Sequence, residues 1–119
     1  VEIVESAIDN ANENKKLNNI SNISFKCGDV KKVVKKLKIK PTAIVVDPPR
    51  SGLDPNTIKF ILNSGAEKLI YVSCDPVTLM RDLKLLNTNY KVLEITPFDM
   101  FPNTYHVESI VLLEKKTNQ

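Results

Sequence analysis

The sequence predicts an α/β fold with a mostly parallel sheet and one antiparallel strand near the C-terminus. Apolar runs of strand length alternate with segments of helical periodicity along the chain, which is the order expected when helices connect successive strands. Proline, glycine and aspartate punctuate the boundaries between these segments. The chain has 119 residues, enough for one core. We therefore expect residues 1–119 to belong to a single domain.

The first third of the chain predicts two strands and two helices. Residues 1–4 resemble the end of a strand, and Ser6 is placed to cap a helix that runs through about Asn18. Residues 23–27 alternate as a strand, and residues 30–37 carry apolar side chains at helical spacing. Lysines fill the other faces of that helix. They favour a solvated face over an RNA contact.

The remaining elements begin with the apolar run 43–47, which is typical of a strand buried on both faces. Asp54-Pro55 predicts a helix start, because aspartate caps a helix and proline suits its first position. Gly65 is placed to end that helix. The later predicted elements are a strand over 69–73, a helix opened by Asp75-Pro76 with its apolar stripe at Leu79, Met80, Leu83 and Leu86, and closing strands over 90–96 and 107–114.

Glycine usage bears on where this fold begins. A nucleotide-binding α/β unit normally starts with a strand and a glycine-rich loop. The chain has only three glycines, and none of them stands in such a loop. We therefore expect the first strand and its glycine-rich loop to be absent from this chain.

Composition narrows the class of protein. The net charge of +3 permits nucleic-acid binding without requiring it. No apolar run approaches the roughly 18 residues of a membrane span, and the start of the chain does not resemble a signal peptide. We therefore predict a cytoplasmic protein. Neither cysteine is expected to form a disulfide there, and no residues have metal-ligand spacing.

Polar side chains follow four of the predicted strands. Glu2, Asp29, Asp47 and Cys74 stand at the carboxyl ends, where folds of this class bind ligands. An acid after the second strand of such a unit commonly accepts ribose hydroxyl groups. An exposed strand-end acid explains Glu2 equally well. Asp47 ends a buried strand and needs partners, although a turn acid is its alternative.

The two cysteines differ in context. Cys74 stands between a strand and a helix N-terminus, whose positive end favours a thiolate. The adjacent Asp75 carboxylate opposes this in part. A small buried side chain remains an equal explanation for Cys74. Cys27 lies inside an alternating strand, and we expect it to be a buried structural residue.

A polar and aromatic loop at residues 98–108 lies between the last two predicted strands. Glu108 stands near the start of the final strand, where an ordinary strand-edge carboxylate is the alternative to a functional one. His106 fits an orienting group and a structural histidine equally well. Arg50 and Arg81 are candidates for phosphate or base contacts, and for Arg81 a solvated helix residue is favoured.

Three segments resemble the signatures of the RNA uracil-5 methyltransferase family, which includes enzymes acting on 23S rRNA and on tRNA. They are Asp47-Pro48-Pro49-Arg50-Ser51-Gly52, residues 71–79 (YVSCDPVTL) and residues 98–108 (FDMFPNTYHVE). Their order and spacing both fit. Two positions depart from the family pattern: Asp75 stands where asparagine is more common, and Asn103 where glutamine is.

The resemblance implies the C-terminal part of a Rossmann-like catalytic domain that uses S-adenosyl-L-methionine. It implies that Glu2 binds the cofactor ribose, that Asp29 lies near the adenine, and that Asp47 lies between cofactor and substrate. Cys74 resembles the family's nucleophile and Glu108 its general base. No metal is implied in this chain.

The implied reaction is methylation of uridine carbon 5 through a cysteine adduct at carbon 6. RNA is the implied partner, with rRNA favoured over tRNA, and Arg50 and His106 are candidate substrate contacts. The isolated chain is expected to be inactive. Two alternatives stay open: an amino-group methyltransferase that uses the Asp47-Pro48-Pro49 turn, and a methyltransferase remnant that only binds. Cofactor binding separates the second alternative from both enzymes.

Overall fold

The computed structural model describes residues 1–117, and the chain divides into two compact units at residues 38 and 39. No helix within residues 1–117 has the length and apolar character needed to cross a membrane.

The first unit contains helix α1 (Glu5–Leu17), the short helix α2 (Val30–Val33) and the 3-10 helix η1 (Val34–Lys36). The predicted helix over 30–37 is therefore present, with a tighter last turn. Helix α1 begins at Glu5, two residues earlier than a Ser6 cap predicts. Its N-cap is Val4, which offers no side-chain hydrogen bond, so the prediction that Ser6 caps the helix is wrong.

The two strands predicted in this unit are reduced to one parallel bridge between Glu2 and Cys27. The Glu2 N–H donates to the Lys26 carbonyl at 3.0 Å, and the Gly28 N–H donates to the Glu2 carbonyl at 2.8 Å. A strand is stabilised by a ladder of such bonds. Within the described residues these two segments pair only through this bridge, so they do not extend into strands.

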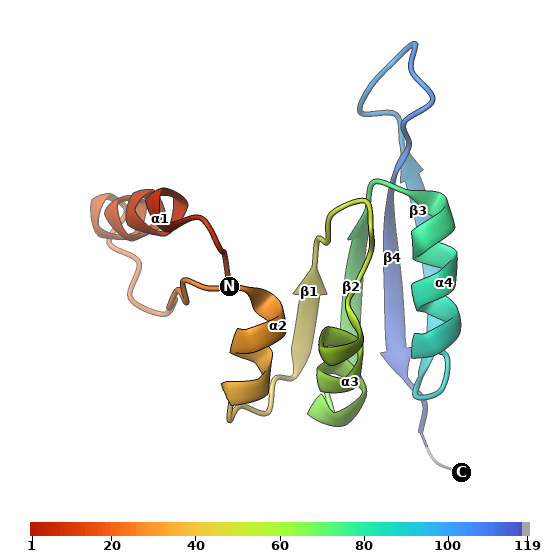
Figure 1. The fold of residues 1–119 in the computed structure, drawn as a ribbon, viewed down its shortest axis with the longest axis horizontal. Helices are drawn as coiled ribbons and strands as arrows, with labels where there is room; N and C mark the ends of the chain where they lie inside the picture. The colour runs from red at the N-terminus through yellow and green to blue at the C-terminus, as the bar shows by residue number, and fades with distance from the viewer. Residues whose placement is uncertain (118–119) are drawn as a thin grey trace. The chain divides into compact units, whose positions relative to one another are not determined.

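The second unit is built on a four-stranded sheet of order β1-β2-β4-β3 (Figure 1). Strands β1 (Ala43–Val46) and β2 (Lys68–Ser73) are parallel. Strand β4 (Glu108–Lys115) runs antiparallel to both β2 and β3 (Tyr90–Phe98). Three strands thus share one direction and β4 opposes them, which confirms the predicted sheet.

Both helices of the second unit begin at an aspartate-proline pair, as predicted. Helix α3 (Pro55–Ser64) is capped by Asp54, whose carboxylate accepts the Asn56 N–H at 2.9 Å. Helix α4 (Pro76–Leu86) is capped by Asp75. Gly65 ends α3 in the left-handed conformation, with φ of 77°.

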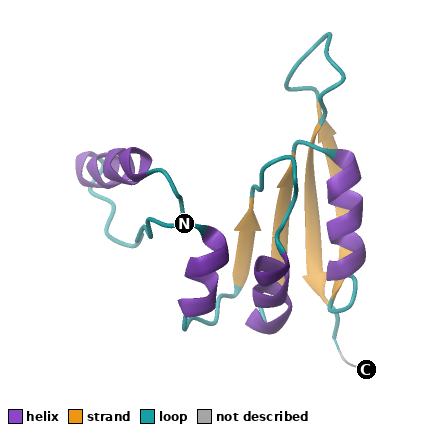
Figure 2. Cartoon of the chain, in the orientation of Figure 1, coloured by secondary structure: helices purple, strands orange, loops and turns teal. Residues whose placement is uncertain are grey.

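Helices α3 and α4 cover one face of this sheet (Figure 2). The buried strand residues alternate along β2 and β4, so they all belong to that face. Strand β1 is not buried on both faces as predicted, because its side chains on the other face are exposed: Val45 is 66% exposed. Met80, predicted in the apolar stripe of α4, is also exposed. The core comprises Ile58, Ile61, Leu69, Tyr71, Leu79, Leu83, Leu86, Tyr90, Val111 and Leu113.

Candidate active site

Three predicted site residues lie at the same end of the second unit's sheet, where β1 and β2 finish and β4 begins. The β2–β4 register ends where Ser73 is opposite Ser109. Cys74 directly follows β2 and Glu108 is the first residue of β4, so both stand at the end of the sheet where this register stops. Asp47 follows β1 at the same end of the sheet, which also carries the β1–α3, β2–α4 and β3–β4 connections (Figure 1).

Ser73 fixes the bend that carries Cys74. Its hydroxyl donates to the Asp75 carbonyl at 2.9 Å and accepts the Asp75 N–H at 3.1 Å, so the two bonds bracket the cysteine. Ser73 is buried and Cys74 is half-buried. The Cys74 thiol therefore stands on a constrained bend at the N-terminus of α4, where the helix dipole stabilises an anion.

Cys27 has a different setting from the one predicted. It is exposed, and its thiol has only a weak contact of 3.8 Å with the Ile3 carbonyl. The prediction of a buried structural cysteine is wrong because the segment forms a single bridge, which leaves the side chain uncovered. Neither cysteine is in a disulfide.

Asp75 stays negatively charged beside Cys74. Its carboxylate accepts the Thr78 N–H at 2.8 Å and the Thr78 hydroxyl at 3.1 Å. The backbone hydrogen bond from Thr78 is the main cause that holds the pKa of Asp75 below its usual value, and the Arg50 charge adds to the effect. Because the folded-state pKa is depressed, this cap stabilises the fold at neutral pH and is lost only as the pH falls through that lowered value.

The two predicted substrate contacts meet each other. The Arg50 guanidinium donates to the His106 ring, with Nη2 at 3.2 Å from Nε2 and a shorter contact to Nδ1. The Tyr105 ring lies 4.5 Å from the His106 ring, and Tyr105 is 88% exposed. Exposed aromatic rings can stack on bases and a guanidinium can hold a phosphate, and His106 contacts one group of each kind.

Sequence reasoning missed Asp82, a fully buried carboxylate behind this site. Its Oδ2 accepts the Leu53 N–H and the Tyr71 hydroxyl, each at 2.7 Å. Its Oδ1 forms an ion pair with Arg81 at 2.8 Å. Burial and the Asp82 hydrogen bond raise the pKa of Tyr71, which therefore stays a hydroxyl donor. The sequence did carry a signal for Asp82, because this carboxylate lies at helical spacing with the apolar stripe of α4. A charge on such a buried face requires partners.

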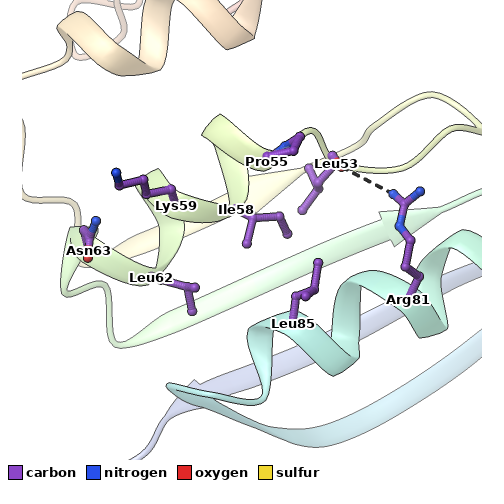
Figure 3. A pocket seen from close by; sticks show the side chains of 8 residues that line it. All are labelled: Leu53, Pro55, Ile58, Lys59, Leu62, Asn63, Arg81 and Leu85. Atoms are coloured by element: carbon purple, nitrogen blue, oxygen red, sulfur yellow. Dashed lines mark hydrogen bonds between the residues drawn. The ribbon is translucent and has the colours of Figure 1, made fainter.

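Arg81 is held against the turn at residues 48–53. Its Nη2 donates to the Ser51 carbonyl at 2.8 Å. It also donates to the Leu53 carbonyl at 3.3 Å (Figure 3). One helical turn earlier, the Thr78 hydroxyl donates to the Arg50 carbonyl at 2.8 Å. Arg81 is thus an exposed residue of α4, with half of its side chain accessible to solvent, but its Nε and Nη2 are engaged by Asp82 and by the turn.

Gly52, the glycine of this turn, should not be replaceable by alanine without a loss of stability. It has φ of 75°, and an added Cβ would lie 2.6 Å from both Arg81 Nη2 and Asp82 Oδ2. We expect Gly52→Ala to lower the free energy of unfolding by more than the ~1–2 kcal/mol of left-handed strain alone. Gly65→Ala is the matched control, because Gly65 has φ of 77° but an added Cβ there would meet only Lys115 Nζ, at an ordinary contact distance of 4.0 Å. Urea denaturation measures both, and equal losses would contradict the steric argument.

The remaining predicted residues belong to the first unit. The Glu2 carboxylate accepts the Val4 N–H at 2.9 Å, and the Glu2 backbone is bonded to Gly28. Asp29 caps α2 by accepting the Lys31 N–H at 3.0 Å. The bridge thus brings Glu2 close to the Gly28-Asp29 turn within this unit. Among residues 1–117, no three histidine, cysteine or acidic side chains are grouped as metal ligands.

An apolar groove of about 630 Å³ lies elsewhere in the second unit, between α3 and α4 (Figure 3). Of the candidate residues that the sequence suggested, Arg81 lines it, whereas Asp47, Arg50, Cys74, His106 and Glu108 do not. Arg81 and Leu53, which belong to the network behind the turn, stand at one end of it. The groove is lined by Leu53, Pro55, Ile58, Lys59, Leu62, Asn63, Arg81 and Leu85.

Comparison with known proteins identifies the family. The sequence pattern of the tRNA (uracil-5-)-methyltransferases matches residues 1–116. The chain belongs to this family. This confirms the resemblance found in the three segments around Asp47, Cys74 and Glu108.

Relatives of this family agree. The chain is 49% identical over 117 residues to an uncharacterized RNA methyltransferase of Clostridium acetobutylicum, and 48% identical over 116 residues to one of Caldanaerobacter subterraneus. These matches cover 98% and 97% of the chain. The chain spans 26% of the length of each of these relatives.

A solved structure in the uracil-5 methyltransferase family supports the fold. The chain resembles the Pyrococcus abyssi tRNA (uracil-54, C5)-methyltransferase, crystallised in complex with S-adenosyl-L-homocysteine, with a TM-score of 0.80 and 36% identity. The match covers 93% of this chain and 27% of that one. The Rossmann-like methyltransferase fold is therefore confirmed.

Proposed function

We propose that the protein containing this chain methylates carbon 5 of a uridine in RNA, with S-adenosyl-L-methionine as the methyl donor. The observation that carries the proposal is the β2–β4 register, because it places Cys74 and Glu108 at the same end of two paired strands. A nucleophile and a general base so placed can act on the same nucleobase, the nucleophile in the addition step and the general base in the elimination step. Family membership supports uracil as that base.

The chemistry follows from the weakness of uracil carbon 5 as a nucleophile. The Cys74 thiolate adds to carbon 6, and the electrons of the 5,6 double bond move toward the carbonyl at carbon 4 to give an enolate. Carbon 5 of the enolate is then nucleophilic. S-adenosyl-L-methionine, when bound, would supply an electrophilic methyl group on its sulfonium, and S-adenosylhomocysteine would leave as carbon 5 takes that methyl group.

Release requires a base. Glu108 takes the proton from carbon 5, the 5,6 double bond forms again, and the bond between carbon 6 and sulfur breaks. Cys74 leaves as a thiolate, ready for the next turnover. Its bend on the N-terminus of α4 stabilises the same anion at the start and at the end of the cycle.

The cofactor assignment rests on carboxylates at segment ends. Glu2 is exposed, and one of its carboxylate oxygens is held by a backbone N–H, which orients an acceptor suited to ribose hydroxyl groups. Asp29 and Asp47 are the proposed partners for the adenine end and for the junction with the substrate. We also propose that residues 1–119 belong to a single catalytic domain and that the protein is cytoplasmic.

The target uridine has to leave its stack to reach Cys74, because carbon 6 is inaccessible in a stacked base. Arg50, held beside His106, supplies a fixed cation for the flanking phosphate. We propose 23S rRNA as the substrate, following the sequence resemblance. The Pyrococcus abyssi relative acts on tRNA, so the experiment includes both RNAs.

The test is an assay of the full-length protein with 23S rRNA or tRNA transcripts and a methyl-labelled donor. Digestion to nucleosides and mass spectrometry are expected to show 5-methyluridine in the rRNA. 5-Methyluridine in tRNA alone would overturn the rRNA assignment and leave the reaction. Methylation of amino groups alone would favour the amino-group alternative.

The chain of 119 residues is expected to bind cofactor poorly and to be inactive, since it spans about a quarter of its relatives. Calorimetric titration with S-adenosylhomocysteine measures this directly. Tight binding at one equivalent would contradict the expectation, whereas absence of binding by the full-length protein would favour a remnant without catalysis.

A further inference from the structure

We propose that Arg81 and Asp82 are positioning residues that set where the Arg50 turn stands relative to Cys74. This inference rests on the proposed function. The turn carries the proposed phosphate contact, and Cys74 is the proposed nucleophile. A rigid link between the two would align the flanking phosphate and the uracil ring before the thiolate adds.

Helix α4 supplies that link. Cys74 directly precedes its cap, and Thr78, Arg81 and Asp82 follow on its first two turns. Each of these three side chains binds backbone of the turn: Thr78 binds the Arg50 carbonyl, Arg81 the Ser51 carbonyl and Asp82 the Leu53 N–H. The turn is therefore bonded at three points to the helix that begins directly after the nucleophile.

The charges explain why the link is stiff. Asp82 is fully buried, and both of its oxygens are used: Oδ2 by Leu53 and Tyr71, and Oδ1 by Arg81 Nε and Nη2 at 2.9 and 2.8 Å. A buried carboxylate without its cation is strongly unfavourable, so Arg81 is held in place. The same Nη2 reaches the turn, and a planar guanidinium can serve both groups where an ammonium cannot.

Gly52 shows that the fit is close. An added Cβ there would collide with both members of the Arg81–Asp82 pair. Arg50 leaves this turn toward His106 in the β3–β4 loop. The network thus extends from the buried Asp82 through the turn to the exposed Arg50 and His106 contacts, with the α4 backbone as its common frame.

The experiment compares Arg81→Ala and Arg81→Lys in the full-length protein, with Lys84→Ala as the matched control. Lys84 is an exposed cation on the same helix and is outside this network. The readouts are the single-turnover rate of adduct formation with 5-fluorouracil RNA at saturating RNA, the affinity for S-adenosylhomocysteine, and the amide exchange rate of Leu53. Fluorine at carbon 5 blocks proton removal, so the adduct accumulates.

We expect Arg81→Ala to slow adduct formation about 10- to 100-fold, the cost of misplacing a reacting group by about an ångström. Arg81→Lys should fall between Arg81→Ala and the wild type, and Lys84→Ala should match the wild type. S-adenosylhomocysteine affinity should stay within about twofold, because the proposed loss lies in alignment and not in cofactor binding. Exchange at Leu53 should become faster in Arg81→Ala.

Three results would overturn the inference. They are a wild-type adduct rate in Arg81→Ala, an equal loss of adduct rate and cofactor affinity, and unchanged Leu53 exchange. The equal loss would show a merely structural role. The Leu53 amide exchange rate can be measured without activity, so it tests the link even if the wild-type protein forms no adduct. Absence of an adduct with the wild-type protein would instead overturn the proposed function.

Discussion

Replacing Cys74 with alanine in the full-length protein is expected to abolish the covalent adduct with 5-fluorouracil RNA and to remove methyl transfer. Alanine cannot add to carbon 6, and without that addition carbon 5 does not become nucleophilic. Loss of a covalent nucleophile costs on the order of 10⁴-fold or more in turnover. The adduct is measured as a species of lower mobility on a denaturing gel, and turnover as labelled methyl incorporated into RNA.

Cys27→Ala is the matched control for this prediction. Cys27 is the other thiol of the chain, is more exposed than Cys74, and belongs to no helix N-terminus. Accessibility alone would therefore favour reaction at Cys27. An adduct that survives in Cys74→Ala and disappears in Cys27→Ala would transfer the nucleophile to Cys27, and an adduct that survives both changes would exclude cysteine attack within this chain.

The parts of the fold that sequence predicted are those fixed by local chemistry. Asp54-Pro55 and Asp75-Pro76 begin α3 and α4, because each pair supplies a cap and a residue without an N–H where none is needed. Gly65 ends α3 because it adopts a positive φ without strain. These decisions involve residues only a few positions apart, so they are visible in the sequence.

The parts that sequence missed depend on distant residues. Asp82 acquires its partners from Tyr71 and Leu53, 11 and 29 positions away. No local pattern predicts which backbone will meet a buried carboxylate. Cys27 was assigned to the core because its segment alternates, but alternation predicts burial only where a ladder and a covering layer form.

The site shows the same division. Cys74 was singled out by position alone, since a strand end before a helix N-terminus is a local feature. Its relation to Glu108 requires the β2–β4 register, which joins residues 36 or more positions apart. Only the three family signatures, taken together, suggested that relation before the sheet was known. The predicted roles of Glu2, Asp29, Asp47, Arg50 and His106 stay predictions.

Glu108→Gln is expected to leave adduct formation intact and to trap the adduct on natural RNA. Glutamine keeps the size of the side chain but cannot take the carbon 5 proton at neutral pH. Addition of Cys74 and methyl transfer both precede that proton, so the methylated adduct should accumulate. Turnover should fall about 100- to 10,000-fold, the usual contribution of a positioned general base.

Glu114→Gln on the same strand tests whether that result belongs to Glu108. Glu114 is at the other end of β4, where its carboxylate pairs with Lys68 at 2.5 Å and with Lys91 at 3.0 Å. These ion pairs hold the pKa of Glu114 below its usual value, so the charge is present at neutral pH and its removal perturbs β4 without touching the site edge. Wild-type turnover in Glu114→Gln with a trapped adduct in Glu108→Gln assigns proton removal to Glu108. Free turnover in both would leave Cys74 as nucleophile and require a different base. Loss of the adduct in Glu108→Gln would instead place that carboxylate before the addition step, because a group needed only for elimination cannot prevent the bond from forming.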